Sequence, residues 1–235
     1  MARRKAIVQK RAEIRRLACE LLEDRIAPAG IDIPTMRSYL QPFLDRSGQK
    51  YVTVVTHGFQ SSDTSSTDSQ NSGDSLYSLA KGIRDLADTV NGTSAASPTA
   101  WLIDYEAVGN DGYFDGTSPS YSTNVSIMPT GAAPDHIVFL FDWARQSNEK
   151  AAGFVESAGD SLFSLLTGTG LVDPAKSSNP TLHFIGHSYG TVVTSECVER
   201  LAYYNVPVAQ VTYLDPHDFR QHSSFPIIGG IQDDL

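Results

Sequence analysis

The chain has 235 residues, of which 40% are hydrophobic, enough for one sizeable core but not comfortably for two. Its formal net charge is −9, so the body of the protein repels phosphate backbones and no nucleic-acid partner is expected for it. Two cysteines supply neither a disulfide framework nor the ligand spacing of a metal site, and no cofactor is predicted. We therefore expect a leader over residues 1–30 and one domain over residues 31–235.

The leader carries its basic side chains mainly in residues 3–16, with apolar residues at helical spacing over 14–22. This pattern predicts a basic amphipathic helix, which is suited to lie on a membrane surface; a solvated helix or a disordered tail is the alternative. The segment at 15–29, RRLACELLEDRIAPA, resembles the Leu-Glu-Asp-Arg type leader of large, exported bacterial surface proteins. The resemblance implies a secreted or envelope-associated protein, of which this chain would be the opening portion.

The first half of the domain alternates apolar and polar segments. Residues 31–43 contain two prolines and predict an irregular lead-in. Residues 50–59, KYVTVVTHGF, are rich in β-branched residues without clean alternation, which predicts a strand buried on both faces. The polar stretch at 61–75 predicts a loop or disorder, and it is followed by a helix over 76–90 and a strand over 101–105.

The second half continues the alternation after a long loop over 105–135 that is rich in Gly, Ser, Tyr and Asn. The patterns then predict, in order, a strand over 136–143, a helix over 151–165, a strand over 181–185, a helix over 189–204 and a strand over 208–214. Strands that alternate with helices pair in parallel through right-handed crossovers. The predicted fold class is therefore α/β, with a doubly wound, mostly parallel sheet.

A candidate nucleophile, Ser188, lies at the centre of a G-x-S-x-G motif between the strand at 181–185 and the helix that follows. Such a turn holds its serine at the C-terminal edge of the sheet in a strained backbone conformation. A Cβ atom at Gly186 or Gly190 would collide with the neighbouring strand or helix. The simpler alternative is a glycine-flanked serine in an ordinary strand-to-helix turn.

Asp215 follows the next strand and is the natural partner of this serine, because a serine hydroxyl needs a histidine base and a carboxylate that orients it. The C-terminal ends of parallel strands converge at one edge, where ligands bind. Attack on a carbonyl also creates an oxyanion, which the main-chain amides of Tyr189 and Phe59 are placed to bind. Asp215 could instead be a turn residue before Pro216.

Four short motifs, HGF at 57–59, FDW at 141–143, GHSYG at 186–190 and YLDP at 213–216, resemble in their order the landmarks of pancreatic-type triacylglycerol lipases of the α/β-hydrolase superfamily. The resemblance implies Ser188 as nucleophile, Asp215 as acid and the amides of Phe59 and Tyr189 as the oxyanion hole. It implies hydrolysis of small-molecule or lipid carboxylic esters through an acyl-enzyme. Tyrosine after the serine and His217 after Pro216 depart from the family pattern and bear on substrate shape.

The catalytic histidine should follow Asp215, where only His217 and His222 are found. His217 is tethered too close to the acid, and the tail after His222 has no room for the remaining strands of a hydrolase sheet. We therefore expect a C-terminally incomplete domain, inactive or weak by itself, with an open sheet edge and poor solubility. On this interpretation His57, His187 and His217 line the site, and no ligand spacing supports a metal there.

Two other functions fit the same motifs. The first is a non-catalytic, hydrolase-like module of a bacterial surface protein, which the missing histidine favours. The second is an acyltransferase or thioesterase, which differs from a lipase in the acceptor or the bond cleaved rather than in the scaffold.

Overall fold

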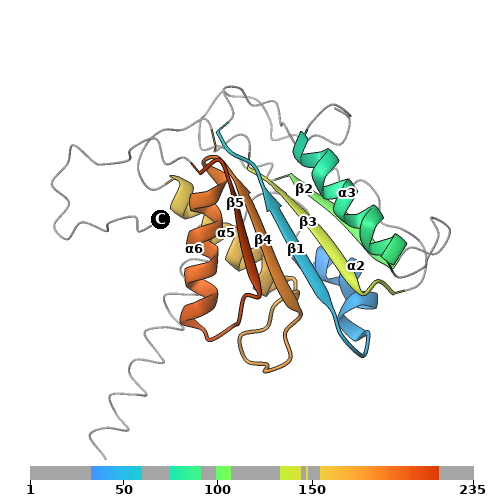
Figure 1. The fold of residues 1–235 in the computed structure, drawn as a ribbon. Helices are drawn as coiled ribbons and strands as arrows, with labels where there is room; N and C mark the ends of the chain where they lie inside the picture. Colours follow the sequence, from blue (N-terminus) through green and yellow to red (C-terminus); the bar gives the residue numbers. More distant parts are fainter. Residues whose placement is uncertain are drawn as a thin grey trace, which may run out of the picture.

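The structure is a computed structural model that describes residues 33–59, 75–90, 99–106, 133–143, 147 and 154–216. These residues form a five-stranded, all-parallel sheet with strand order β2-β3-β1-β4-β5 (Figure 1). The strands are β1 (Tyr51–Thr56), β2 (Ala100–Glu106), β3 (His136–Asp142), β4 (Thr181–His187) and β5 (Gln210–Leu214). The leader, the segment 60–74, most of the predicted loop at 105–135 and both histidines after Asp215 lie outside the described residues.

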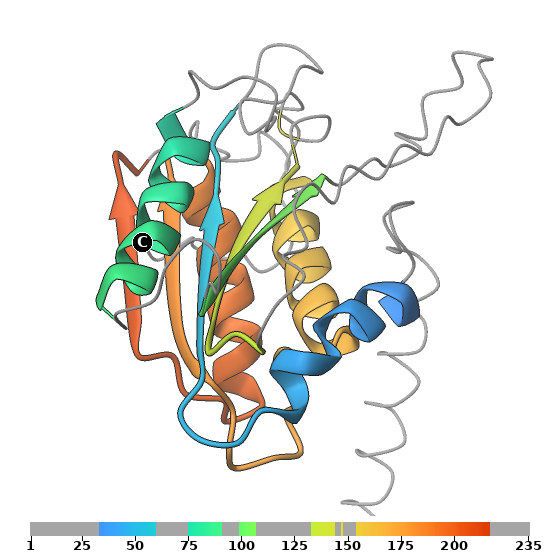
Figure 2. The same cartoon turned by 90° about the vertical axis from the view of Figure 1, so that its right-hand side faces the viewer.

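Four helices within the described ranges flank the sheet: α2 (Ile33–Asp45), α3 (Ser75–Val90), α5 (Phe154–Gly168) and α6 (Gly190–Tyr203). Helix α3 covers one face, and α2, α5 and α6 lie on the other (Figure 2). This arrangement confirms the predicted α/β doubly wound fold, and every predicted strand is present.

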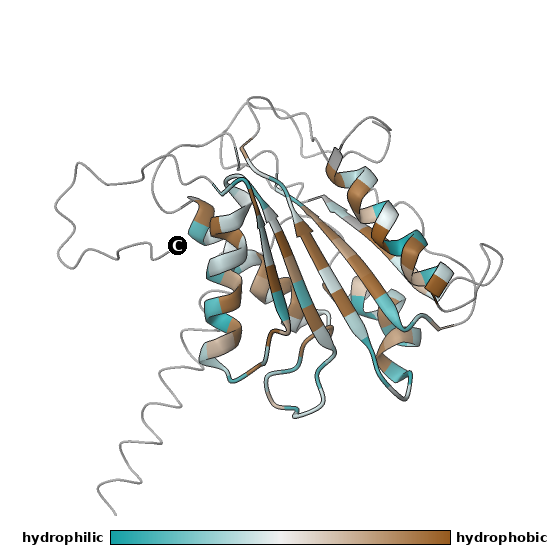
Figure 3. Cartoon of the chain, in the orientation of Figure 1, coloured by the Kyte–Doolittle hydropathy of each residue, from teal (hydrophilic) through white to brown (hydrophobic). Residues whose placement is uncertain are grey.

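The core is built from strands that are buried on both faces. In β1 and β3 only the first residue of each strand is accessible, and hydrophobic residues run along these central strands (Figure 3). One face packs against α2, α5 and α6, with Leu162 and Leu201 fully buried there. The other face packs against α3 through Leu76 and Ala80. Continuous apolar runs, rather than alternating ones, are what a parallel sheet between two helical layers requires.

The predicted irregular lead-in at 31–43 is wrong, because this segment forms α2 despite a proline inside the helix, Pro42. Met36, Leu40 and Phe43 recur at helical spacing and are at most 1% exposed. Burial of each contributes roughly 1.5–3 kcal/mol, whereas an internal proline costs about 3 kcal/mol. The periodic burial therefore outweighs the lost backbone hydrogen bond.

The sheet reverses its winding at β1, which lies between β3 and β4. The chain leaves β1 toward α3 on one face, whereas it leaves β4 toward α6 on the other. Ligands of doubly wound proteins bind outside the carboxyl ends of the strands at such a reversal. The residues that follow β1 and β4 are therefore the first place to look for a site.

Candidate active site

Ser188 directly follows β4 and adopts a left-handed backbone conformation, with φ of 51°. A residue with a Cβ atom costs energy in this region, so the conformation has to be maintained by its surroundings. Both the amide and the hydroxyl of Thr191 donate to the Ser188 carbonyl, at 3.0 and 2.7 Å. The predicted strain at this serine is thus confirmed, and its half-buried side chain stands at the turn between β4 and α6.

The two glycines of the motif are required by close contacts. A Cβ atom on Gly186 would lie 2.7 Å from the carbonyl oxygen of Gly190 and 2.8 Å from the Cα of Thr191. A Cβ atom on Gly190 would lie 2.3 Å from the carbonyl oxygen of His57. Real Cβ contacts are not this short, so the predicted steric reason for both glycines is confirmed.

Gly58, which sequence analysis left without a role of its own, brings the segment after β1 against the serine. A Cβ atom on Gly58 would lie 2.6 Å from the Cβ of Ser188 and 3.0 Å from its Oγ. The main chain at residues 57–59 therefore passes directly over Ser188. This places Phe59, whose side chain packs partly buried against the core, one residue from the point of contact.

Asp215 lies at the same edge of the sheet as Ser188. His187 of β4 is in register with Leu214 of β5, and the Ser188 amide donates to the Leu214 carbonyl at 2.8 Å. Asp215 comes next and is also left-handed, with φ of 47°. Its side chain is exposed, whereas the carboxylate of a Ser-His-Asp triad is ordinarily buried against its histidine.

His57 is fully buried and both of its ring nitrogens are engaged. Nδ1 lies 2.7 Å from the Gly58 carbonyl, to which it donates, so Nε2 of the neutral ring accepts the Trp143 amide at 2.9 Å. Asp142 Oδ1 lies 3.0 Å from Nε2 and would accept its proton in the charged form of the ring. His57 thus fixes the main chain after β1 and is not directed at Ser188 as a base.

Trp143 connects this segment to the serine turn. Its indole N–H donates to the His57 carbonyl at 2.8 Å, and its ring stacks on His57 with centroids 5.6 Å apart. On its other side it contacts the ring of Tyr189, 5.8 Å between centroids. Trp143 and Tyr189 are at most 1% exposed, so the ends of β1, β3 and β4 form one packed unit.

Asp142 and Trp143 are site residues to which the sequence analysis gave no role, although it noted their motif, FDW at 141–143. Both follow from β3 being the neighbour of β1, with Thr56 in register with Phe141. Asp142 could have been recognised from the sequence as Asp215 was, because each is a carboxylate at the carboxyl end of a predicted strand. Its partner, His57, is 85 residues away in the chain, so the pairing depends on the strand order.

Two further histidines lie in the amino-terminal half of the sheet, away from the serine. Nε2 of His136 is 2.9 Å from the Thr53 hydroxyl, and Nε2 of His183 is 3.0 Å from the Thr212 hydroxyl. Burial lowers the pKa of both imidazoles, which favours their neutral forms. These histidines are structural.

His187 immediately precedes Ser188 and is half-buried. Side chains alternate along a strand, so His187 leaves β4 on the side of Ile185, which packs in the cluster under α3. None of the four histidines in the described ranges is therefore held against Ser188. His217 and His222 lie outside those ranges.

Tyr189 is the N-cap residue of α6, with φ of −60°. The first main-chain N–H groups of a helix have no partner within the helix and carry partial positive charge, which favours an anion at that end. The amide of Tyr189 belongs to this helix start, directly after Ser188. The oxyanion role suggested for the amides of Tyr189 and Phe59 stays a prediction, since the contact that the structure shows here is that of Gly58 with Ser188.

Among the described residues there is no group of three or more His, Cys, Asp or Glu side chains that could hold a metal ion. None of the described helices combines the length and the apolar character needed to cross a bilayer. Cys197 is a free, fully buried cysteine on α6, and burial raises the pKa of its thiol, so it is not a competing nucleophile.

Comparison with known proteins adds no family to this description. The chain has no significant match to a protein-family model, to a curated protein or to a solved structure. Its function is therefore inferred from the residues of the site.

Proposed function

We propose that this protein is a serine hydrolase of the lipase or esterase type, with Ser188 as nucleophile and Asp215 as the acid partner. The observation that carries the proposal is the left-handed Ser188 between β4 and α6, closely covered by Gly58. A strained, non-glycine residue at a ligand-binding edge is maintained only where the surrounding structure compels it. This supports a serine whose placement serves a reaction.

In the proposed reaction, Ser188 Oγ attacks the ester carbonyl carbon while a histidine takes the hydroxyl proton. The amides of Phe59 and Tyr189 bind the oxyanion that forms. The carbon–oxygen bond to the alcohol then breaks, and the alcohol leaves with the proton from the histidine. Water repeats the sequence on the acyl-enzyme, releasing the carboxylic acid and restoring Ser188.

Carboxylic esters are the proposed substrates because the four motifs resemble those of pancreatic-type lipases. The motifs HGF and FDW supply the residues of the buried His57, Asp142 and Trp143 unit. This unit fixes the main chain at Gly58 and Phe59, where the oxyanion would be bound. The resemblance therefore concerns residues that are packed together, although it does not identify the acyl chain.

The base is proposed to follow Asp215 in the chain, as it does in hydrolases of this fold. His217→Ala and His222→Ala, each measured separately, test the two histidines found there. Loss of reaction in one variant, with the other unchanged, identifies the base. If neither variant loses reaction, both histidines are excluded from that role.

A fluorophosphonate probe, which reacts covalently with activated serines, tests the proposal directly. We expect the wild type to be labelled, slowly if neither His217 nor His222 serves as the base, and labelling to be lost in Ser188→Ala. Ser195→Ala is the matched control, because Ser195 lies on α6 and its hydroxyl bonds to the hydroxyl of Tyr213, 2.7 Å away, rather than to the serine turn. Its labelling rate should stay within about twofold of the wild type.

Equal labelling of Ser188→Ala and wild type would refute the assignment of the nucleophile. An unlabelled wild-type protein that is folded by circular dichroism would fit both a hydrolase domain that lacks its base, as the sequence predicts, and the second candidate, a non-catalytic module. The exposure of Asp215 favours that candidate, since no described histidine lies against its carboxylate. Product analysis with water and with an added alcohol separates a hydrolase from an acyltransferase.

Secretion or association with the bacterial envelope belongs to the same proposal and depends on the leader-like residues 15–29. Fractionation of cells that express the chain with and without residues 1–30 tests it. Retention of both forms in the cytoplasm would contradict a targeting role for the leader.

A further inference from the structure

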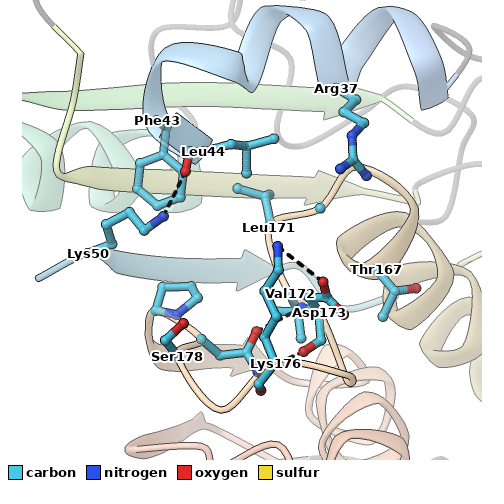
Figure 4. A pocket seen from close by; sticks show the side chains of 13 residues that line it. Arg37, Phe43, Leu44, Lys50, Thr167, Leu171, Val172, Asp173, Lys176 and Ser178 are labelled. Carbon is cyan, nitrogen blue, oxygen red and sulfur yellow. Dashed lines mark hydrogen bonds and ion pairs between the residues drawn. The ribbon is translucent and has the colours of Figure 1, made fainter. Parts of the chain in front are cut away.

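A cavity of about 420 Å³ lies at the end of the sheet opposite to Ser188. It is formed by α2 between Arg37 and Leu44, by Lys50 just before β1, and by the end of α5 with the segment that joins it to β4 (Figure 4). Strand β1 has six residues, so roughly 20 Å of sheet separates this cavity from the serine edge. The cavity is therefore distinct from the proposed active site.

Three cations from three different segments surround the cavity: Arg37 from α2, Lys50 before β1 and Lys176 from the loop before β4. Figure 4 shows them with Asp173, the only carboxylate that lines the cavity within the described residues. The local charge is therefore positive in a chain whose formal net charge is −9. Such a concentration of charge attracts anions to this end of the molecule.

Lys50 is held in place by two contacts, and Arg37 lies close to Gly170. The Lys50 ammonium donates to the Leu44 carbonyl at 3.0 Å and lies 5.4 Å from the centre of the Phe43 ring. Arg37 lies across Gly170, where a Cβ atom would be only 3.1 Å from its guanidinium. Gly170 has φ of 82°, so both its backbone and its missing side chain suit this arrangement.

The Lys176 ammonium forms an ion pair with the Asp173 carboxylate, 3.2 Å away, within the loop between α5 and β4. The Ala175 amide and then the Lys176 ammonium hold the pKa of the Asp173 carboxyl below its ordinary value. Arg37 also lines the cavity, and its positive charge lowers this pKa as well.

Asn179 fixes the shape of this loop. Its Oδ1 accepts the Asp173 amide at 2.7 Å, and its Nδ2 donates to the carbonyls of Asp173 and Lys176 at 3.0 and 3.1 Å. The loop is also joined to β1, because the Thr181 amide donates to the Lys50 carbonyl at 2.8 Å. A ligand would meet an arranged site, which reduces the entropy lost on binding.

Most of the accessible wall between the cations is polar. Phe43, Leu171 and Val172 lie behind it and are at most 1% exposed, so they offer a ligand little apolar surface. A volume of about 420 Å³ falls within the range of roughly 300–1,000 Å³ that is typical of small-ligand sites. The combination suits a small molecule with one compact, strongly negative group.

We propose that this cavity binds a small organic phosphate, with its phosphate between Arg37 and Lys176. Guanidinium groups bind phosphate oxygens through two parallel hydrogen bonds, and ammonium groups add charge. The phosphate could belong to a soluble metabolite or to a lipid headgroup, which share this chemistry. The site is independent of hydrolysis at Ser188.

Phenyl phosphate is the test ligand, with inorganic phosphate and the neutral benzyl alcohol as comparisons, and binding is followed by calorimetry and NMR. We expect saturable binding of phenyl phosphate and of inorganic phosphate, weakened by added salt, and no binding of benzyl alcohol. Arg37→Gln and Lys176→Gln should each weaken it roughly tenfold or more. Arg84→Gln on α3, which removes a cation paired with Asp85, should leave it unchanged.

Arg37 and Lys176 are exposed, so both variants should keep the wild-type melting temperature. Absence of saturable phenyl phosphate binding to the wild type, or equal binding by the Arg37→Gln and Lys176→Gln variants, would overturn the proposal. Ser188→Ala should bind as the wild type does, so failure of the hydrolase proposal leaves this test intact.

Vesicles of phosphatidylcholine with and without phosphatidic acid distinguish the two sources of phosphate. Binding that requires phosphatidic acid and is weakened in Arg37→Gln supports a headgroup in the cavity. Phenyl phosphate binding without such vesicle binding supports a soluble ligand. Vesicle binding unaffected by Arg37→Gln, together with no phenyl phosphate binding, assigns the attraction to the basic leader and refutes the cavity as a site.

Discussion

Substitution of Gly58 by alanine tests how closely the segment after β1 covers the serine. The added Cβ atom would lie 2.6 Å from the Cβ of Ser188, 2.9 Å from the His187 carbonyl and 3.0 Å from Ser188 Oγ. The φ angle of Gly58 is not left-handed, so the backbone itself accepts alanine. Any effect of this substitution therefore comes from the contact with the serine turn.

The cost follows from the distance that has to open. Carbon atoms pack at about 3.5–4.0 Å, so the two main-chain segments must separate by roughly 1 Å. Overpacking of this kind costs about 1–3 kcal/mol of stability. A displacement of roughly 1 Å at a reacting group lowers its rate about a hundredfold. We expect both effects in Gly58→Ala.

Urea unfolding measures the first effect and the rate of fluorophosphonate labelling measures the second. The control is Gly82→Ala on the exposed side of α3, where an added Cβ atom meets nothing within 4 Å. Alanine should stabilise that helix by roughly 0.5–1 kcal/mol and leave labelling unchanged. If Gly58→Ala is as stable as the wild type and is labelled at the same rate, the close contact with Ser188 is wrong.

Three further predictions concern other parts of the fold. Trp143→Phe removes the indole donor from the buried His57 carbonyl and should lower stability by at least about 1–3 kcal/mol in urea unfolding; an unchanged midpoint would contradict that hydrogen bond. Gly159→Ala would place a Cβ atom 2.4 Å from the Cβ of Glu196, so it should lower the midpoint of urea unfolding although alanine favours helices. A raised midpoint would refute the close contact between α5 and α6. Burial lowers the pKa of His183, so the unfolded chain takes up a proton below about pH 6.5 that the folded imidazole does not. Stability should fall between pH 7.5 and 5.5, and His183→Gln should reduce that loss; the same pH dependence in the variant would argue against this cause.

The strands and the serine turn could be predicted from the sequence because their signals are local. Residues 50–59 are rich in β-branched residues without clean alternation, which indicates a strand between two helical layers. Ser188 stands between two glycines at the switch from strand to helix, so its conformation follows from neighbouring residues. Signals confined to ten or so residues need no knowledge of the strand order.

The errors and omissions have physical reasons. The prediction for residues 31–43 followed the two prolines and overlooked the helical spacing of Met36, Leu40 and Phe43. The burial of those three residues stabilises α2. The pairing of His57 with Asp142 depends on β1 and β3 being neighbours in the sheet. A short sequence motif does not predict which strands are neighbours.

The cavity near Arg37 could not be predicted from the sequence either. Its cations come from segments up to 139 positions apart, Arg37, Lys50 and Lys176. Each is an ordinary surface residue when considered alone, and only the fold brings them around one space. Sites assembled from one residue per segment leave no local pattern.

The contact between the segment after β1 and the serine turn also limits how this protein can change. The His57 carbonyl lies close to Gly190 and accepts the indole N–H of Trp143. A side chain at position 190 would meet main-chain atoms of residues 56 and 57, which no substitution of those residues removes. Libraries that randomise the serine turn should therefore keep glycine at position 190 in every folded member, whereas position 143 can vary at a cost in stability.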